Sequence, residues 1–331
     1  MACLLKGLKN SVLNPPILEA PARKPWISHL TAVVTVTDDG GSSGRLRDEL
    51  RILPTGDIRN CLVALSADES LMSQLFQYRF VGTGDLQGHS FGNLFLTALT
   101  GVTGDFLKAI RLSSEVLAIR GRIYPSTLED VHLVGTMDEG TRVRGESAIS
   151  KAGMRIRKIA LSPRDCHPVP AVVQAMRNAD IITLGPGSLY TSLIPNLLVR
   201  GIVTEIRRSR ALKVLIGNLM TQPGETTSLD AADHVEAIRE HAHAKLFDTI
   251  ILNSKPVPPA QIARYRKQGA LPVETDRERL RKMGLDIYEA DLLAAERVVR
   301  HNPDLLAAAV YTAYEQWKAA AGDRRLKIAR A

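Results

Sequence analysis

Two adjacent carboxylates are the first candidates for a binding or catalytic role in this 331-residue chain. The apolar run LTAVVTV (30–36) leads directly into TDDGGSSGRLR (37–47), so Asp38 and Asp39 stand at the end of an expected strand. A carboxylate placed there can bind a magnesium ion or accept a hydrogen bond from a ribose hydroxyl. Because side chains alternate along a strand, we expect at most one of the two to face a given ligand atom.

The small residues after the aspartates favour an anion site. Gly40, Gly41 and Ser42 offer little side-chain obstruction to a phosphate that approaches the backbone N–H groups. The competing interpretation is a capped turn that leads into a helix starting at Arg45. Three glycines within five residues are more than a plain strand-to-helix connection needs, which shifts the balance toward a ligand site.

A second glycine-rich turn follows the apolar segment ADIITLG (179–185). Gly185, Gly187 and Ser188 lie between this expected strand and an expected helix, where backbone amides commonly bind phosphate. The turn matches neither the dinucleotide fingerprint GxGxxG nor the P-loop, so those labels do not apply. A tight turn with a serine cap is the alternative.

Three further polar segments also follow strands or precede helices: LPTGDIRNCLVAL (53–65), GHSFGNLFLTALT (88–100) and GNLMTQPGETTSL (217–229). Asp57 is a candidate helix cap, and His89 is a candidate base for which no partner is evident. Asn60, Asn93 and Asn218 are the candidates for orienting a ligand through their amide groups. Because parallel strands end at one edge of a sheet, we expect all five motifs to converge there.

Short β-branched segments alternate with helical stretches along the chain, which is typical of a parallel sheet covered on both faces. The expected strands are 31–36, 131–136, 156–161, 179–185, 212–218 and 247–253. The fold class that follows is α/β, a Rossmann-like, doubly wound and mostly parallel sheet.

We expect one domain over residues 1–331. Within it, residues 14–25 contain four prolines and form a loop, because proline is excluded from regular helices and central strands. Residues from about 110 to 160 are rich in glycine, arginine and turns and predict an inserted β-hairpin region. Residues 320–331 form a basic tail.

Composition narrows the class of partner. The formal net charge of +8 favours an anionic ligand, whereas aromatic residues make up only 5% of the chain and no dense basic block occurs. We therefore expect a phosphate-bearing small molecule and no nucleic acid. Three separated cysteines and no apolar run long enough to cross a bilayer predict a cytoplasmic protein with no membrane insertion.

Taken together, the five motifs and QYRF (77–80) resemble the YvcK/CofD-like family, and the closer branch is that of the bacterial gluconeogenesis factors. The resemblance covers about residues 30–305. It implies a Rossmann-like fold that binds a nucleotide or a nucleotide sugar, and a link to carbon metabolism, cell shape and peptidoglycan synthesis. The related 2-phospho-L-lactate transferases use magnesium, and their aspartates matching Asp38 and Asp39 lie at the reaction centre. The family is often dimeric, so the resemblance also raises a homodimer as an expectation.

The resemblance has one departure near the N-terminus. Family members begin with a strand and a glycine-rich turn ahead of a segment similar to LLKGLKN (4–10), and neither precedes it here. Either translation starts upstream of Met1 or a central strand is lost. The first is favoured, since a lost central strand would expose a large apolar edge. Near the other end, VVRHNPDLLA (298–307) resembles the family's closing segment, where Arg300 would pair with a diphosphate unless it is a plain surface arginine.

The sequence thus predicts a regulatory protein that binds a uridine diphosphate sugar such as UDP-GlcNAc. In this hypothesis Gly185, Gly187 and Ser188 bind phosphate, and Asp38 and Asp39 contact the sugar or a magnesium ion. The alternative is a magnesium-dependent transferase of the phospholactyl type, in which Asp38 and Asp39 are catalytic and the substrate is activated by a nucleoside diphosphate. Whether the protein is an enzyme stays open at this point, with the regulator preferred.

Overall fold

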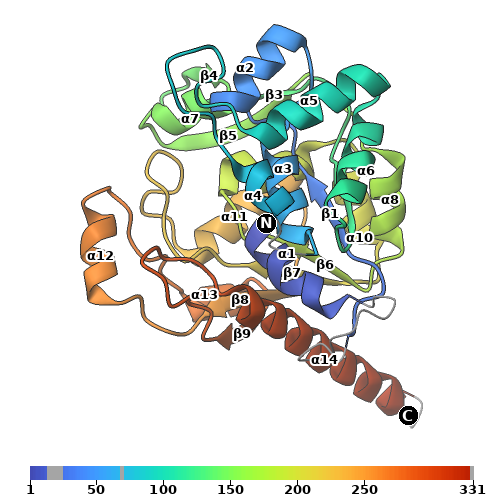
Figure 1. The fold of residues 1–331 in the computed structure, drawn as a ribbon. Helices are drawn as coiled ribbons and strands as arrows, with labels where there is room; N and C mark the ends of the chain where they lie inside the picture. The colour runs from blue at the N-terminus through green and yellow to red at the C-terminus, as the bar shows by residue number, and fades with distance from the viewer. Residues whose placement is uncertain (13–24, 68–70, 329–331) are drawn as a thin grey trace.

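A computed structural model describes residues 1–12, 25–67 and 71–328 and shows an α/β protein (Figure 1). The predicted proline-rich loop therefore lies largely outside the described residues, as do the last residues of the predicted basic tail. The strands are β1 (Thr31–Val34), β2 (Arg122–Pro125), β3 (His132–Met137), β4 (Arg142–Arg144), β5 (Ile156–Ser162), β6 (Ile181–Leu184), β7 (Leu212–Ile216), β8 (Thr249–Asn253) and β9 (Asp286–Ala290). The helical segments are α1 (Ala2–Leu8), η1 (Lys9–Ser11), α2 (Gly41–Leu50), α3 (Gly56–Leu65), α4 (Leu71–Gln77), α5 (Phe91–Thr103), α6 (Phe106–Val116), α7 (Glu146–Lys151), α8 (Pro170–Arg177), η2 (Leu189–Leu193), α9 (Ile194–Leu198), α10 (Ile202–Arg208), α11 (Ala231–Ala242), α12 (Pro259–Arg266), α13 (Arg277–Lys282) and α14 (Pro303–Ile328).

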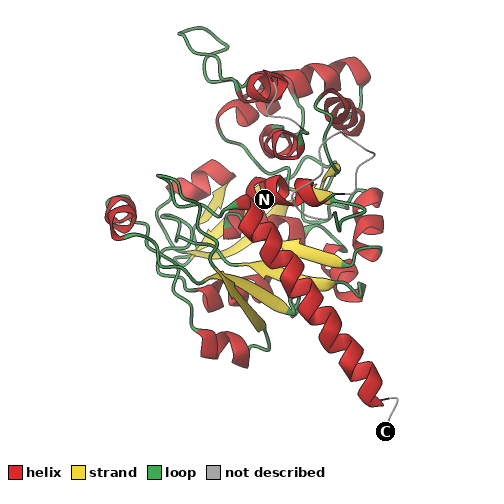
Figure 2. Ribbon diagram, turned by 60° about the horizontal axis from the view of Figure 1, so that its bottom comes forward, coloured by secondary structure: helices red, strands yellow, loops and turns green. Residues whose placement is uncertain are grey.

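The largest sheet is parallel and has the strand order β6-β7-β8-β9. Helices cover both of its faces, as Figure 2 shows. The side chains of β7 alternate between these faces: Leu212 and Val214 pack with α1 and α14, whereas Leu215 packs with the core formed by α8 to α11. The predicted doubly wound α/β class is therefore confirmed.

Two smaller sheets accompany it. The strands β1 and β2 pair in parallel, and β3 pairs antiparallel with both β4 and β5. Segments 131–136 and 156–161 lie in the region of about 110–160 for which the sequence predicts an inserted β-hairpin, and they also stand among the strands expected to alternate with helices. The short β3–β4 connection turns the chain back on itself, so both segments pair antiparallel and lie outside the parallel sheet. The edge strand β9 was not expected, because its sequence DIYEA is polar and every residue in it is exposed or half-buried.

The helix after β1 begins earlier than expected. It starts at Gly41 rather than at Arg45, with Gly40 as its N-cap in an extended conformation. Gly44 lies so close to the carbonyl oxygen of Asp39 that a Cβ there would overlap it. The glycines therefore let the first helical turn pack against the strand end, a role that the sequence pattern did not separate from anion binding.

The helices α1 and α14 lie side by side (Figure 1). Their contact depends on Gly7, because a Cβ at this position would overlap the backbone carbonyl of Pro303. Leu4 and Leu8 of α1 pack with Leu306 and Val310 of α14 in one core cluster. The first helix is thereby fixed against the outer face of the parallel sheet.

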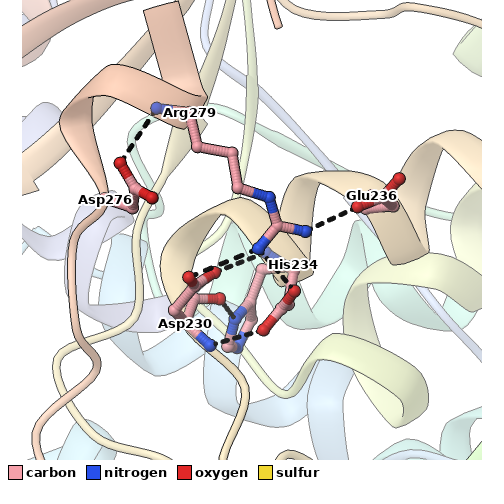
Figure 3. Close-up of polar contacts among 6 residues, drawn as sticks. Asp230, His234, Glu236, Asp276 and Arg279 are labelled. Carbon is pink, nitrogen blue, oxygen red and sulfur yellow. Dashed lines mark hydrogen bonds and ion pairs between the residues drawn. The ribbon is translucent and has the colours of Figure 1, made fainter. Parts of the chain in front are cut away.

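A charged network holds α13 against α11 (Figure 3). Arg279 forms ion pairs with Asp230, Asp233 and Glu236, and these carboxylates raise the pKa of its guanidinium. Asp230 also caps α11 by accepting a hydrogen bond from the backbone N–H of Asp233. This network positions the helix that follows the polar segment 217–229.

Candidate functional site

The Asp38 carboxylate is placed by two glycines. Its Oδ1 accepts a hydrogen bond of 2.9 Å from the backbone N–H of Gly40, within the loop that leaves β1. A Cβ on Gly56, the first residue of α3, would lie only 2.6 Å from its Oδ2. Asp38 is half-buried, so one side of the carboxylate remains open to solvent or to a ligand.

The Asp39 carboxylate points to a different element. Its Oδ1 accepts a hydrogen bond of 2.8 Å from the backbone N–H of Ser147 in α7. Gly145, with φ of 99°, lies so close to Oδ2 that a Cβ would overlap it. The expectation that the two neighbouring aspartates have different surroundings is therefore correct in geometry.

The carboxyl groups of Asp57 and Glu146 lie near Asp38, and that of Glu225 lies near Glu146. Burial, followed by the charges of Asp38 and Asp57, raises the pKa of Glu146 to about 9. Burial and the charge of Asp38 raise the pKa of Asp57, and burial raises that of Glu225. Glu146 is therefore expected to carry a proton at neutral pH, which makes it a hydrogen-bond donor among carboxylates.

The second glycine-rich turn forms a polar cluster with the segment after β7. The Asn218 amide donates a hydrogen bond of 3.0 Å to the carbonyl of Gly187. The Gln222 amide donates one of 2.8 Å to the Ser188 hydroxyl. Gly185 adopts a φ of 96° and lies against the backbone of Ile216, so the turn is packed against the neighbouring strand.

Glu225 joins this cluster to the Asp38 side. Its Oε1 accepts hydrogen bonds from Ser150 of α7, at 3.0 Å, and from Thr191 of η2, at 3.4 Å. Its Oε2 is buried and has no hydrogen-bond partner among the described residues. Because the charge of Glu225 also acts on Glu146, the two glycine-rich segments converge on one carboxyl-rich centre.

Two of the predicted ligand residues are occupied by contacts with each other. The buried Asn93 donates from Nδ2 to the hydroxyls of Ser42, at 3.1 Å, and Ser43, at 3.4 Å. The Ser42 hydroxyl also lies 3.0 Å from Nδ1 of His89. Together they fix the start of α2 against the start of α5. Asn93 keeps a buried Oδ1 that has no partner within the described part of the chain.

One basic residue near the carboxyl-rich centre, Arg59, comes from α3. Arg59 is 7% exposed and donates a hydrogen bond of 2.8 Å to Oδ1 of its neighbour Asn60. The negative charges of Asp57 and Asp38 also act on its guanidinium group. Asn60 is exposed at the start of α3. Thr55 precedes the helix as its N-cap, so the interpretation of Asp57 as the cap is wrong. Asp57 instead belongs to the carboxyl-rich centre.

Arg300 is exposed on the segment between β9 and α14. Its charge acts on Cys3 of α1, and no described contact joins it to Asp38 or to the turn at Gly185. Its role toward a diphosphate therefore stays a prediction.

Glu146 is the residue that sequence reasoning missed. It follows Gly145 and opens a helix of six residues, and its carboxyl approaches Asp38 only because α7 packs beside the β1 loop. The signal available in the sequence was the Arg-Gly-Glu step after a short strand, which resembles an ordinary surface turn.

The magnesium site predicted at Asp38 and Asp39 stays a prediction. Within residues 1–12, 25–67 and 71–328, no three His, Cys, Asp or Glu side chains are arranged to hold a metal ion. Asp38 and Asp39 each turn one oxygen to a backbone N–H. No reaction step through magnesium follows from this arrangement.

The raised pKa of Glu146 makes stability depend on pH. The folded state retains this proton up to about pH 9, whereas the unfolded group loses it near the ordinary glutamate pKa of 4.5. Between these values the folded state binds more protons, so the free energy of unfolding falls as pH rises, by up to about 1.4 kcal/mol per pH unit. Glu146→Gln should flatten this slope in urea titrations between pH 5.5 and 8.5. Glu115→Gln, on the exposed face of α6, should leave it unchanged, and parallel slopes for wild type and Glu146→Gln would contradict the assignment.

None of the helices in the described part of the chain has the length and apolar character needed to span a bilayer.

The comparisons with known proteins agree with this fold. The family model of 2-phospho-L-lactate transferase CofD matches residues 1–293. The gluconeogenesis factor of Bacillus subtilis (strain 168) is 45% identical over 303 residues, which cover 91% of each chain. A crystal structure of a UPF0052 family member from Bacillus halodurans has a TM-score of 0.86 and 44% identity, covering 94% of both chains. A relative from Nostoc sp. (strain PCC 7120) is 48% identical over 287 residues, and this chain spans 63% of its length.

Proposed function

This chain belongs to the CofD family, and from that premise we propose that it binds a nucleotide sugar, such as UDP-GlcNAc, as a regulator of carbon metabolism and cell-envelope growth. The relative from Bacillus subtilis carries the name gluconeogenesis factor, which supports the metabolic part of the proposal. UDP-sugar binding and the effect on cell shape are the parts that need direct measurement.

One observation carries the proposal: the glycine-rich segments after β1 and β6 meet at one carboxyl-rich centre. The loop at Gly185–Ser188 contributes backbone amides suited to a diphosphate, and Asn218 and Gln222 hold that loop in place. Asp38 and the protonated Glu146 offer an acceptor and a donor for sugar hydroxyls. Arg59, on which the charges of Asp57 and Asp38 act, provides a cation near the carboxyl-rich centre.

Isothermal titration calorimetry with UDP-GlcNAc, UDP-glucose, UDP and ATP tests the ligand. Asp38→Asn preserves the shape of the side chain but removes its charge, and we expect at least about tenfold weaker binding of the sugar nucleotide, equivalent to about 1.4 kcal/mol. Asp105→Asn, at the exposed cap of α6, is the control and should bind like the wild type. Equal affinity for all three proteins, or no binding of any uridine nucleotide, contradicts the proposal.

The transferase alternative makes a different prediction with the same protein. An enzyme would convert a nucleoside-diphosphate-activated substrate into product in the presence of magnesium, and Asp38→Asn would abolish that turnover. Sustained turnover would replace the regulator hypothesis.

The regulatory role can be tested in cells by complementation. In a Bacillus subtilis strain that lacks its own gluconeogenesis factor, this chain should restore growth and cell shape on a gluconeogenic carbon source. Asp38→Asn, expressed to the same level, should restore neither.

A further inference from the structure

The antiparallel sheet β4-β3-β5 has one apolar face and one face that reaches solvent. Leu133 and Met137 of β3 are fully buried in the same core cluster as Ile149 of α7. Because side chains alternate along a strand, Val134 and Thr136 of β3 point to the opposite face, where both are only half-buried. We call this second side the outer face of the sheet.

The outer face carries exposed cations on both sides of β3. The strand register places Arg142 of β4 and Lys158 of β5 opposite Thr136, one on each side. Neighbouring strands lie about 4.8 Å apart, so the Cα atoms of these two residues are about 10 Å apart. Arg144 follows on the same face, about 7 Å further along β4. All three residues are exposed, and none forms an ion pair with another described residue.

The carboxylates near the ends of β3 do not neutralise these cations. Asp130 forms an ion pair with Arg47, and Asp138 forms one with Arg155 at 3.8 Å. Glu139 is exposed in the turn between β3 and β4, beyond the end of both strands. Positive charge therefore predominates on the outer face, and an anionic group is attracted to it.

The free edge of β4 offers backbone groups beside these cations. In the part of the chain that the structure describes, β4 pairs only with β3. The two hydrogen bonds at the ends of this ladder run from backbone N–H to carbonyl oxygen, from Gly145 to Leu133 and from Met137 to Thr141. Bonded pairs alternate along an antiparallel ladder, so Arg142 and Arg144 turn their N–H and C=O groups away from β3. The same two residues thus present both a positive side chain and an open strand edge.

This combination determines the chemistry of the partner. A phosphate or a lipid head group can pair with the arginines, but the N–H and C=O groups of a strand edge are matched by another polypeptide backbone. A second copy of this chain that added β4 to β4 would place like charges opposite each other, which is unfavourable. An extended segment with acidic side chains satisfies both the backbone and the charges.

We propose that the edge of β4 is a docking site for an extended acidic segment of another protein, which adds as a strand antiparallel to β4. The antiparallel direction continues the pairing of the whole sheet. Residues of the added strand that lie opposite Arg142 and Arg144 share their face of the sheet, so the segment carries carboxylates at every second position. Opposite charges on directly paired residues stabilise the added strand.

The peptide acetyl-Glu-Val-Glu-Val-Glu-Val-amide is the probe for this site, with its binding to the full chain followed by fluorescence anisotropy. We expect binding to slow amide hydrogen exchange at Arg142 and Arg144 at least tenfold, while exchange in β9, at the edge of the other sheet, stays unchanged. The double variant Arg142→Gln/Arg144→Gln should bind at least tenfold more weakly. The control Arg266→Gln/Lys267→Gln removes the same charge at the exposed end of α12 and should bind like the wild type.

Methylation of the peptide backbone separates strand addition from attraction by charge alone. In the antiparallel arrangement the glutamate N–H groups bond to β4, whereas the valine N–H groups point away from it. N-methylation of the glutamates should therefore weaken binding at least tenfold, and N-methylation of the valines should leave it unchanged. Equal affinity of the two methylated peptides would overturn strand addition.

Three further results would also contradict the docking site. Undiminished binding by Arg142→Gln/Arg144→Gln would place the peptide elsewhere on the protein. Displacement of the peptide by heparin or by phosphatidylserine vesicles at equal charge concentration would show a surface that recognises any polyanion. The absence of binding by the unmodified peptide at low ionic strength, where attraction between exposed charges is strongest, would exclude the site outright.

Discussion

Gly145→Ala is expected to lower the free energy of unfolding by about 3 kcal/mol. The residue has a φ of 99°, which is unfavourable for alanine, and its new Cβ would overlap Oδ2 of Asp39. Relief of that overlap requires the Asp39 carboxylate to move, which breaks its hydrogen bond with the N–H of Ser147. The substitution therefore removes both a backbone conformation and an anchor between the β1 loop and α7.

Gly140→Ala is the matched control for this prediction. Gly140 also has a positive φ, of 83°, but nothing lies within 4 Å of the position of its Cβ. It should lose only about 1 kcal/mol, the cost of the left-handed backbone alone. Chemical unfolding of the three proteins in urea measures the difference. If both variants lose the same amount, the close approach of Asp39 to Gly145 has no energetic weight.

Gly7→Ala is the second substitution for which we expect a large effect. In α1 an alanine is intrinsically better than glycine by about 1 kcal/mol, yet here its Cβ would overlap the carbonyl of Pro303. Backbone atoms cannot rotate away as a side chain can, so α1 and α14 must separate and lose part of their shared apolar contact. We expect a net loss of about 2–3 kcal/mol, read from urea unfolding, together with faster amide exchange in both helices.

Gly101→Ala is the same substitution in another helix, and it should raise the free energy of unfolding instead of lowering it. Gly101 lies in the last turn of α5, and nothing lies within 4 Å of the position of its Cβ. It should gain about 0.5–1 kcal/mol from helix propensity. If both substitutions raise the free energy of unfolding, α1 and α14 can move apart without loss of stability, which contradicts the prediction for Gly7.

The sequence patterns predicted the positions of the strands better than the way in which the strands pair. The segments that form β1, β5, β6, β7 and β8 were expected within a few residues, because apolar β-branched runs mark buried strands. A hairpin region was predicted over about 110–160, but the sequence did not specify that β3 pairs with β5, since a short apolar run is compatible with several partners. The start of α2 at Gly41 was missed because glycine and serine are as common in loops as in a first helical turn.

The site was predictable where it depends on strand ends and unpredictable where it depends on packing. Gly187, Ser188 and Asn218 cluster as expected because they follow neighbouring parallel strands. Asn93 was expected to face a ligand, yet its amide nitrogen binds the hydroxyls of Ser42 and Ser43, which lie about fifty residues earlier. The pKa of Glu146 is raised first by burial and then by the charges of carboxylates on other segments, and no local pattern encodes those surroundings.

The separation of the core has a consequence for how the protein unfolds. One apolar cluster joins β1 to α3, α5 and α6, and another joins the β7–β8 region to α1 and α14. Such clusters correspond to cooperative units that open with their own free energies. A ligand held by Asp38 and by the loop at Gly185 would contact one strand end from each sheet. Its binding energy would therefore stabilise the ends of both sheets together, and amide hydrogen exchange should slow in β1 and β6 alike when the ligand is saturating.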